Sequence, residues 1–501
     1  MNRTTNWSTV VGLALVGSIA GSAIAQSDKP AQPATVTVDF AKSRGTLLRT
    51  ERYNNVSRPT TFEPQRNSDV AFYNEQGLHG QVYRVWVDTH LIHDEATGAY
   101  NYAVVEDYLA DLSRLSDNLL VVLDTRVAIR DRGVKPAQIK PVVKTILLEL
   151  KQRFPNIRYI EAFNEPDHNL AKALKPEQLY DYYVPYYEAV NEVNRELKPK
   201  MPIEVGGPAF TTYNEPWLRA FLDRYKADTT PAKRLDFISY HAYGEFPEGT
   251  GDAGGPRAYH FYKGDPSEVA GQRAKLEQEL SSRGLNPKTP TFITELGIYP
   301  GPSFDHQNDP KPDYIINAAG VPSLVYWFLE QPNSYPFNWV LRHKTEERKD
   351  QLVTRNEGGP AARTFTPYGN TLVMMAKLKG ERVVAQSSAL AQGQGVYTIA
   401  TKDRTGAAVM VWNYQHTNTQ RHRVTINMGN LPANLRGKSV RQRMYRIDAR
   451  TSNYWADPTK ASLQQVGDTV LEPQSRASVT VDLPANALQL IVLEPAKGAS
   501  K

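Results

Sequence analysis

Short apolar runs alternate with longer amphipathic segments along the first 380 residues of this chain. An apolar run bounded by turn residues is typical of a strand buried on both faces, and an amphipathic segment after it indicates a helix that covers the sheet. The eight expected strands lie at 46–49, 82–87, 119–123, 159–163, 203–205, 237–241, 291–294 and 337–341. The amphipathic segments lie at 105–115, 139–154, 176–197, 217–228, 266–283 and 314–329. Eight strands with intervening helices predict an α/β protein with a (β/α)8 TIM barrel, whose functional side chains gather at the C-terminal strand ends.

After residue 379 the alternation of strand-like and helix-like segments gives way to short strand-like runs alone. Strand-like runs at 395–401, 407–413, 421–428, 440–447, 478–483 and 488–493 are separated by turn residues, which indicates an antiparallel β-sandwich. Residues 35–40 alternate between apolar and polar positions but precede the barrel repeat, so we expect this strand to join the sandwich. The predicted organisation is a signal peptide at 1–25, a linker at 26–34, an N-terminal strand at 35–40, a barrel at 41–379 and a β-sandwich at 380–501.

The first 25 residues carry the pattern of an export signal. Arg3 is their only charged residue, and an apolar stretch follows at 10–24. Ala23-Ile24-Ala25 is a small-x-small cleavage site, which would leave Gln26 at the mature N-terminus. The stretch is short for a membrane span, which needs about 20 residues. We therefore expect an exported protein, periplasmic or secreted, without a membrane span after cleavage.

The composition excludes several kinds of chemistry. The chain has no cysteine, which removes disulfides, thiolate metal sites and cysteine nucleophiles. It also lacks a glycine-rich phosphate loop, a His-Glu-x-x-His pair and a nucleophile elbow. We expect neither a cofactor nor a metal, and an exported chain without a recognition motif is not expected to bind nucleic acid.

Positive charge is concentrated in the C-terminal part. Residues 381–501 contain 15 Lys and Arg against 8 Asp and Glu, in a chain whose net charge is +6. This excess is dominated by a basic cluster formed by Arg436, Lys438, Arg441, Arg443, Arg446 and Arg450. Solvated strand faces would account for the cluster, and so would attraction to an anionic polysaccharide.

Two glutamates stand at the ends of predicted strands. Glu165 lies in Asn164-Glu165-Pro166 after the fourth strand, and Glu295 ends the seventh strand before Gly297. Both would then project into one barrel mouth, where two carboxyl groups can act as acid/base and nucleophile on a glycosidic bond. Close like charges that are partly shielded from water are expected to raise the pKa of Glu165. The alternative is a barrel that binds carbohydrate without efficient turnover.

Four segments resemble glycoside hydrolase family 39 and, more broadly, the retaining barrel glycosidases with catalytic residues on strands four and seven. They are 159–167, Val205-Gly206-Gly207-Pro208-Ala209, Ser239-Tyr240-His241-Ala242-Tyr243-Gly244 and Ile293-Thr294-Glu295. The resemblance spans roughly residues 35–495. It implies Glu165 as acid/base and Glu295 as nucleophile of a double-displacement mechanism on an oligo- or polysaccharide. It also implies that Asn164, His241 and Tyr243 line the sugar site.

The second strand departs from the family pattern. An Arg-Phe-His-Gly type segment is typical there, whereas this chain has Arg84-Val85-Trp86-Val87-Asp88. Because this strand end would shape the terminal sugar pocket, we include Trp86 among the candidate sugar contacts and expect xylosidase activity to be weak or absent.

Three more residues at strand ends are candidate substrate contacts. Arg84 and Asp124 suit either a substrate contact or a structural ion pair, and Trp339 at the eighth strand suits stacking on a sugar face. The sequence leaves open the sugar and its linkage, exo against endo action, and the oligomeric state.

Overall fold

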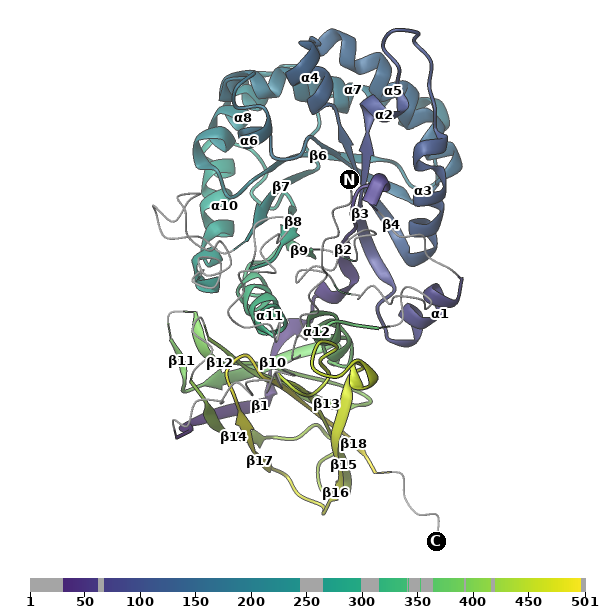
Figure 1. The fold of residues 1–501 in the computed structure, drawn as a ribbon. Coiled ribbons are helices and arrows are strands. Elements are labelled where there is room, and N and C mark those ends of the chain that lie inside the picture. The colour runs from purple at the N-terminus through teal and green to yellow at the C-terminus, as the bar shows by residue number, and fades with distance from the viewer. Residues whose placement is uncertain are drawn as a thin grey trace, which may run out of the picture.

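The computed structural model describes residues 30–61, 67–243, 265–298, 315–339, 341, 352, 364–391, 393–415 and 420–496. The expected signal peptide lies outside these residues. The chain forms a barrel of parallel strands and helices, and a second sheet packs against one side of it (Figure 1).

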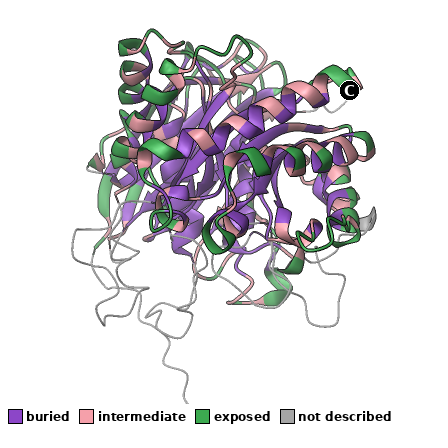
Figure 2. Ribbon diagram, turned by 90° about the horizontal axis from the view of Figure 1, so that it is seen from above, coloured by how far each residue is buried: buried purple, intermediate pink, exposed green. Residues whose placement is uncertain are grey.

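Eight parallel strands close into a barrel, which confirms the predicted fold class. They are β2 (Tyr53–Asn55), β3 (Gly80–Asp88), β4 (Ser116–Asp124), β5 (Ile157–Ala162), β6 (Glu204–Phe210), β7 (Phe237–Ala242), β8 (Thr291–Leu296) and β9 (Ser334–Asn338). Seen from above, buried strands occupy the centre and helices with exposed outer faces surround them (Figure 2). The C-terminal ends of these strands form one mouth, where a TIM barrel carries its chemistry.

The first barrel strand lies later in the chain than predicted. The run 46–49 is wrong as a barrel strand, because the N–H of Leu47 donates to the carbonyl of Gly380 at 2.8 Å, outside the barrel. The strand is formed instead by Tyr53–Asn55, in which Asn54 and Asn55 are buried. Two buried amides in a strand of three residues leave no apolar run that a hydrophobic pattern could reveal.

An asparagine side chain helps to close the barrel at this short strand. β2 and β9 share a single residue pair, Asn54 with Asn338. The Asn338 amide donates to the carbonyls of Thr50 and Tyr53 at 2.8 and 2.9 Å. These bonds satisfy backbone acceptors that a longer ladder would have satisfied.

Aromatic rings fill the barrel interior below the mouth. Tyr159, Phe237, Phe292 and Phe337 belong to one buried cluster, and the rings of Phe237 and Phe292 stack with their centroids 4.6 Å apart. The neighbouring strand β6 must approach closely, because a Cβ at Gly206 would lie 2.2 Å from the carbonyl oxygen of Phe237. Glycine is therefore required at this position.

Six helices coincide with the predicted amphipathic segments. They are α3 (Ala103–Leu115), α5 (Pro136–Arg153), α7 (Leu179–Leu197), α8 (Glu215–Ala227), α10 (Gln272–Ser282) and α11 (Ile316–Phe328). The structure adds α1 (Asn67–Glu75), α2 (Thr89–Ile92), α4 (Arg126–Arg132), α6 (Pro166–Asn169) and α12 (Pro367–Ala376). In the part of the chain that the structure describes, no helix has the length and hydropathy to cross a bilayer.

The second sheet has ten strands and is built from both ends of the chain. Its strands are β1 (Gln32–Thr46), β10 (Glu381–Ser387), β11 (Leu390–Ala391), β12 (Gln394–Asp403), β13 (Gly406–Tyr414), β14 (His422–Gly429), β15 (Val440–Ile447), β16 (Gln464–Leu471), β17 (Ala477–Leu483) and β18 (Leu488–Pro495). Nine of them follow the order β16-β15-β18-β13-β12-β10-β1-β14-β17, and β11 pairs with β12. Residues of β1, β13, β14 and β18 share one apolar cluster, so the sheet curls over its own core.

The N-terminal strand lies inside this sheet, between β10 and β14. β1 pairs antiparallel with β10 and parallel with β14, so the sheet is mixed where a purely antiparallel sandwich was expected. β1 begins inside the segment predicted as a linker, 26–34, and continues beyond the predicted strand, 35–40. Irregular pairing with β10 extends it to Thr46, which explains why the alternating pattern marks only its centre.

The sheet packs on α11 and α12, which lie between it and the barrel (Figure 1). Trp412 of β13 stacks on Tyr397 at 5.2 Å, and its indole N–H donates to the hydroxyl of Ser323 on α11 at 2.8 Å. Asn370 of α12 donates to the carbonyl of Ser452 at 2.9 Å. A large buried ring whose N–H group is hydrogen-bonded therefore fixes the sheet to the helices of the barrel.

Half of the basic cluster is engaged in ion pairs. Arg441 contacts Asp468 at 2.6 Å. Arg443 pairs with Glu494, and Arg446 pairs with Asp448. These pairs reduce the positive field that the sequence alone predicts at this face.

Candidate active site

The two predicted carboxylates meet at the barrel mouth. Glu165 follows β5 and Glu295 lies in β8, while His241 of β7 and Tyr243 directly after β7 lie between them. One oxygen of Glu165, one oxygen of Glu295 and a ring nitrogen of His241 all lie within 4.8 Å of one another. The side chain of Glu165 is 24 % exposed and that of Glu295 only 5 %. One carboxylate is therefore open to a ligand, whereas the other lies deeper.

The backbone turns sharply at Glu165. This residue has φ 50° and ψ 53°, in the left-handed region that non-glycine residues rarely adopt. Its N–H donates to the carbonyl of Ala209 at 2.8 Å, and Pro166 then begins helix α6. Such local strain persists only where surrounding contacts hold it, and it is frequent at functional sites.

Glu295 is held by two hydrogen-bond donors. The guanidinium of Arg84 donates from Nη1 to Oε1 at 2.8 Å. The hydroxyl of Tyr243 donates to Oε2. Both carboxylate oxygens therefore accept hydrogen bonds, which fix the orientation of the side chain.

Arg84 organises the floor of the site. It is fully buried and donates to Glu161 at 2.6 Å, to Asn164 at 2.9 Å and to Asn55 at 3.3 Å, in addition to Glu295. This commitment makes Arg84 a structural ion-pair partner and argues against the substrate contact that was the other reading. Glu161 and Asn55 were not predicted, although Glu161 lies on β5 and Glu165 follows that strand four positions later.

His241 links the two carboxylates. Its Nδ1 lies 3.0 Å from Oε1 of Glu165 and 3.7 Å from Oε2 of Glu295. The ring is buried, and its Nε2 has no hydrogen-bond partner among the described residues. A proton on Nδ1 would therefore be donated to Glu165, the nearer of the two carboxylates.

The pKa of Glu165 is lowered by its neighbour His241, whereas a raised pKa was expected. Burial raises the pKa of Glu165, but the hydrogen bond and charge of His241, aided by His168 and Arg84, lower it below its ordinary value. Burial lowers the pKa of His241, but the charges of Glu295 and Glu165 raise it above the ordinary value. The prediction of a raised pKa for Glu165 is wrong, because it considered the like charge and omitted the histidine.

Glu165, His241 and Glu295 are also close enough to resemble a metal-ligand set. His241 Nδ1 is, however, at hydrogen-bond distance from Glu165, and the Arg84 guanidinium contacts Glu295 at 2.8 Å. A fixed cation at that position opposes a second one. The expectation that the site works without a metal stays a prediction.

The remaining predicted sugar contacts are at the mouth but poorly exposed. Asn164, Trp86, Asp124 and Trp339 are each at most 7 % exposed. Trp86 lies 4.2 Å from the guanidinium of Arg58 and donates its indole N–H to the protein backbone. These packing roles argue against a direct sugar contact for Trp86.

Asp124 belongs to an ionic network at the ends of β3 and β4. It contacts Arg126 at 3.0 Å and Arg58 at 3.6 Å, and Arg58 also pairs with Asp88. The structural ion pair is therefore the reading that the structure favours for Asp124. Arg58, which the sequence analysis missed, lies in a loop without a motif.

Comparisons with solved structures agree with this architecture. A bacterial orthologue of human α-L-iduronidase aligns with a TM-score of 0.69 at 14 % identity, over 93 % of this chain and 85 % of that one. A monomeric β-xylosidase from Caulobacter crescentus CB15 aligns at 0.64 and 15 %, over 92 % and 100 %. A GH39 enzyme from Xanthomonas axonopodis pv. citri aligns at 0.62 and 15 %, over 93 % and 98 %. At these identities the likeness shows the fold alone.

The sequence itself gives the family. A search of curated proteins found no match. A family model, however, described as Glycosyl hydrolases family 39, matches residues 156–472, which is more than half of the chain and includes Glu165, His241 and Glu295. This match favours an enzyme over the alternative of a binding protein without turnover. The chain belongs to glycosyl hydrolase family 39 and is a glycosidase.

Proposed function

We propose that this protein is a retaining glycoside hydrolase that cleaves O-glycosidic bonds of an extracytoplasmic oligo- or polysaccharide by double displacement. The observation that carries the proposal is the spacing of Glu165 and Glu295, which bring carboxylate oxygens within 4.8 Å of each other. Retaining glycosidases place their carboxyl groups about 5–5.5 Å apart, whereas inverting enzymes leave about 6.5–9.5 Å for a water.

The surroundings of each carboxylate support its role. Glu295 is buried and held in place by Arg84 and Tyr243, which suits a nucleophile that attacks the anomeric carbon. Glu165 is more exposed, and its Oε1 lies 3.0 Å from Nδ1 of His241, which suits a group that exchanges a proton with the leaving oxygen. After the glycosyl ester forms on Glu295, Glu165 accepts a proton from the attacking water.

The roles are separated by leaving-group dependence. In Glu165→Ala, hydrolysis of glycosides with poor leaving groups should fall much more than hydrolysis of activated aryl glycosides, which need little proton donation. Azide should restore turnover and give a glycosyl azide of retained configuration. Glu204→Ala is the control, because Glu204 lies at the start of β6 and its carboxylate is 34 % exposed. Equal loss on both substrate types without azide rescue would refute Glu165 as acid/base.

The nucleophile is tested by covalent labelling. Glu295→Gln should abolish intermediate formation and nearly all turnover, because a neutral amide cannot attack the anomeric carbon. A 2-fluoro glycosyl fluoride should label Glu295 in the unaltered protein, as read by peptide mass. Labelling of another residue would contradict the assignment.

The location outside the cytoplasm rests on the export pattern in residues 1–25. We expect the mature protein in the periplasm or medium to begin at Gln26, which mass spectrometry of the purified protein measures. A mature chain that retains Met1 would contradict this part of the proposal.

Specificity outside β-xylosides is supported by the second barrel strand. Trp86 is packed between Arg58 and Arg84, and Asp88 pairs with Arg58, so this strand end differs from the family's usual segment. We expect hydrolysis of an aryl β-xyloside to be weak beside other glycosides. Efficient cleavage of the xyloside would contradict the proposal.

An acidic polysaccharide is a further proposal, which rests on the basic cluster. Any attraction should weaken as salt is raised, because charges interact over only about 8 Å at physiological ionic strength. Comparing neutral and uronic-acid polymers at low and high salt tests this, and salt-independent binding would contradict it.

A further inference from the structure

A cavity lies on the same side of the barrel as the catalytic pair. It has a volume of about 320 Å³ and is lined by residues that follow β3 and β4, together with α5. This volume is at the lower end of the range of small-molecule sites. Thr89 and Thr125 are the residues directly after these two strands, and β4 is the neighbour of β5, which leads to Glu165.

The polar wall of the cavity carries the hydroxyls of Thr89 and Thr125 together with the imidazoles of His90 and His93. Thr89 donates its hydroxyl hydrogen to the carbonyl of Asp124 at 3.0 Å. Tyr186 donates to the carbonyl of Leu123 at 2.9 Å, so the 2.7 Å contact between Thr125 and Tyr186 must use the hydrogen of Thr125. Each hydroxyl hydrogen is thus committed within the protein, and only oxygen lone pairs remain for a ligand.

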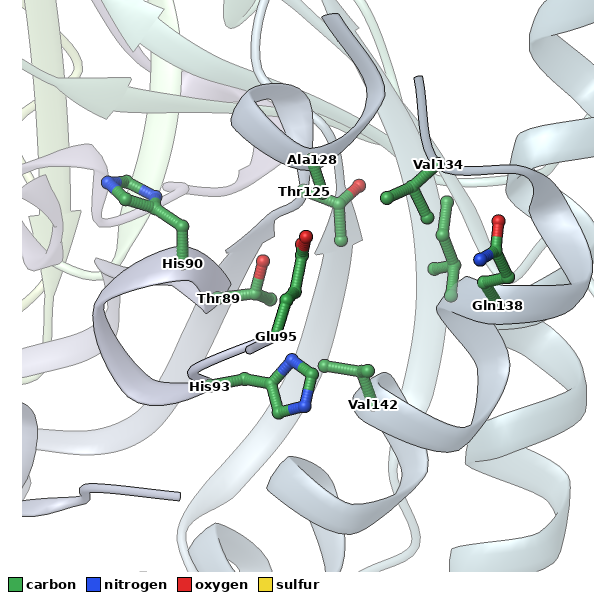
Figure 3. A pocket seen from close by; sticks show the side chains of 10 residues that line it. Thr89, His90, His93, Glu95, Thr125, Ala128, Val134, Gln138 and Val142 are labelled. Carbon is green, nitrogen blue, oxygen red and sulfur yellow. The ribbon is translucent and has the colours of Figure 1, made fainter. Parts of the chain in front are cut away.

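The carboxylate of Glu95 completes this wall. Figure 3 shows its carboxyl group directed toward Thr125, with Thr89 beside it. Arg132 contacts one oxygen of Glu95 at 3.0 Å and holds the side chain at the rim. A carboxylate offers about four lone-pair sites, so it can still accept bonds from a ligand.

The facing wall is apolar. Ala128, Val134, Ile139 and Val142 line it. Gln138 adds one donor at its edge, because its Oε1 accepts from the backbone N–H of Lys135 at 2.9 Å and its amide nitrogen remains.

We propose that this cavity binds a neutral sugar unit of the substrate chain, away from the bond that is cleaved. A pyranose ring carries several hydroxyl groups, which both donate and accept, and apolar C–H faces, which match the polar wall and the apolar wall. The carboxylate of Glu95 and the lone pairs of Thr89 and Thr125 disfavour a uronate, although His90 and His93 also line the cavity. The inference rests on the proposed function in so far as the sugar belongs to the substrate.

Binding can be measured without turnover. Saturation-transfer NMR on the full-length protein would use methyl β-D-xylopyranoside, methyl β-D-glucopyranoside and methyl β-D-glucuronide as probes. Val134→Trp fills the cavity from a half-buried loop position, and Val104→Trp is the control at an exposed position on α3. We expect a neutral glycoside to bind the unaltered protein and the control, and Val134→Trp to weaken it by about tenfold or more.

The outcomes separate this inference from the catalytic proposal. Unchanged binding in Val134→Trp, no binding of either neutral glycoside, or equally tight binding of the glucuronide would each overturn the sugar site. Hydrolysis of a short aryl glycoside should be the same in Val134→Trp and the unaltered protein, because its reacting groups lie elsewhere. If the catalytic assignment is wrong, the activities of the Glu165 and Glu295 variants will show it. The glycoside binding measured by NMR would not change.

Discussion

Replacing Arg84 by methionine tests whether one buried cation holds the active site together. Arg84 is fully buried and donates to Glu161 and Glu295, whose side chains are 0 % and 5 % exposed. Removing one partner of a buried ion pair typically costs about 3–5 kcal/mol, because the remaining charge has lost both water and its counterion. Arg84→Met leaves two such charges, so we expect a loss of at least about 3 kcal/mol in unfolding free energy.

The matched control is Arg158→Met. Arg158 lies in a barrel strand and pairs with Glu204 at 3.0 Å, but the two side chains are 39 % and 34 % exposed. Exposed pairs contribute about 0–1 kcal/mol, so this variant should unfold nearly like the unaltered protein. The comparison isolates burial as the cause.

Two assays follow from the same reasoning. Urea unfolding gives the difference in unfolding free energy between the Arg84→Met and Arg158→Met proteins. Hydrolysis of an aryl glycoside should fall about 100-fold or more, since Arg84 orients Glu295 directly. An Arg84→Met protein as stable and as active as Arg158→Met would refute the reasoning.

Two further predictions concern pH and packing. The pKa of His241 is raised, so its contribution to stability is complete below its ordinary pKa of 6.5 and is lost as the pH rises through the pKa of the folded state. The pKa of Glu165 is lowered, so its contribution to stability is present above its ordinary pKa of 4.5 and is lost in acid. Unfolding free energy should therefore be highest between about pH 4.5 and 6.5, and His241→Asn should flatten the alkaline decline in urea titrations; an unchanged profile would contradict this. Gly206→Ala should cost about 1–3 kcal/mol, because its Cβ would lie 2.2 Å from the Phe237 carbonyl, whereas Gly380→Ala, with no atom within 4 Å, should leave the urea midpoint nearly unchanged. Equal midpoints for the two alanine variants would show that β6 can move away.

The hydrophobic pattern was sufficient for most of the barrel. Seven of the eight expected strands overlap the observed ones, and the six expected helices are present, because each buries a continuous apolar face. β2 was missed because its residues Tyr53–Asn55 are held by amide hydrogen bonds. α12 has only ten residues and is buried along nearly its whole length, so it shows no polar face with a helical period; α11 is buried in the same way but is longer, with 13 residues.

The candidate site shows a similar division. Glu165 and Glu295 were identified because strand ends and a following proline or glycine mark their positions. The partners of Arg84 could not be predicted from their spacing in the sequence. Glu161 lies on β5, which is not a neighbour of the strand that carries Arg84, and Asn55 lies on β2, the strand that was not predicted. The pKa direction of Glu165 depended on a 3.0 Å contact with His241, which is a property of packing and not of sequence order.

The position of β1 sets the order in which this chain can be completed. Thr35 contacts Ser388, 353 positions later, so β1 is synthesised long before its partner strands. Until the C-terminal residues arrive, Val36, Val38 and Phe40 have no core and an unpaired strand edge is exposed. Loop closure over such a distance is slow, so the sheet should form last, after the barrel. A truncated chain would therefore carry an unpaired, aggregation-prone N-terminal strand. Aggregation or degradation of such chains would remove them and leave the full-length enzyme.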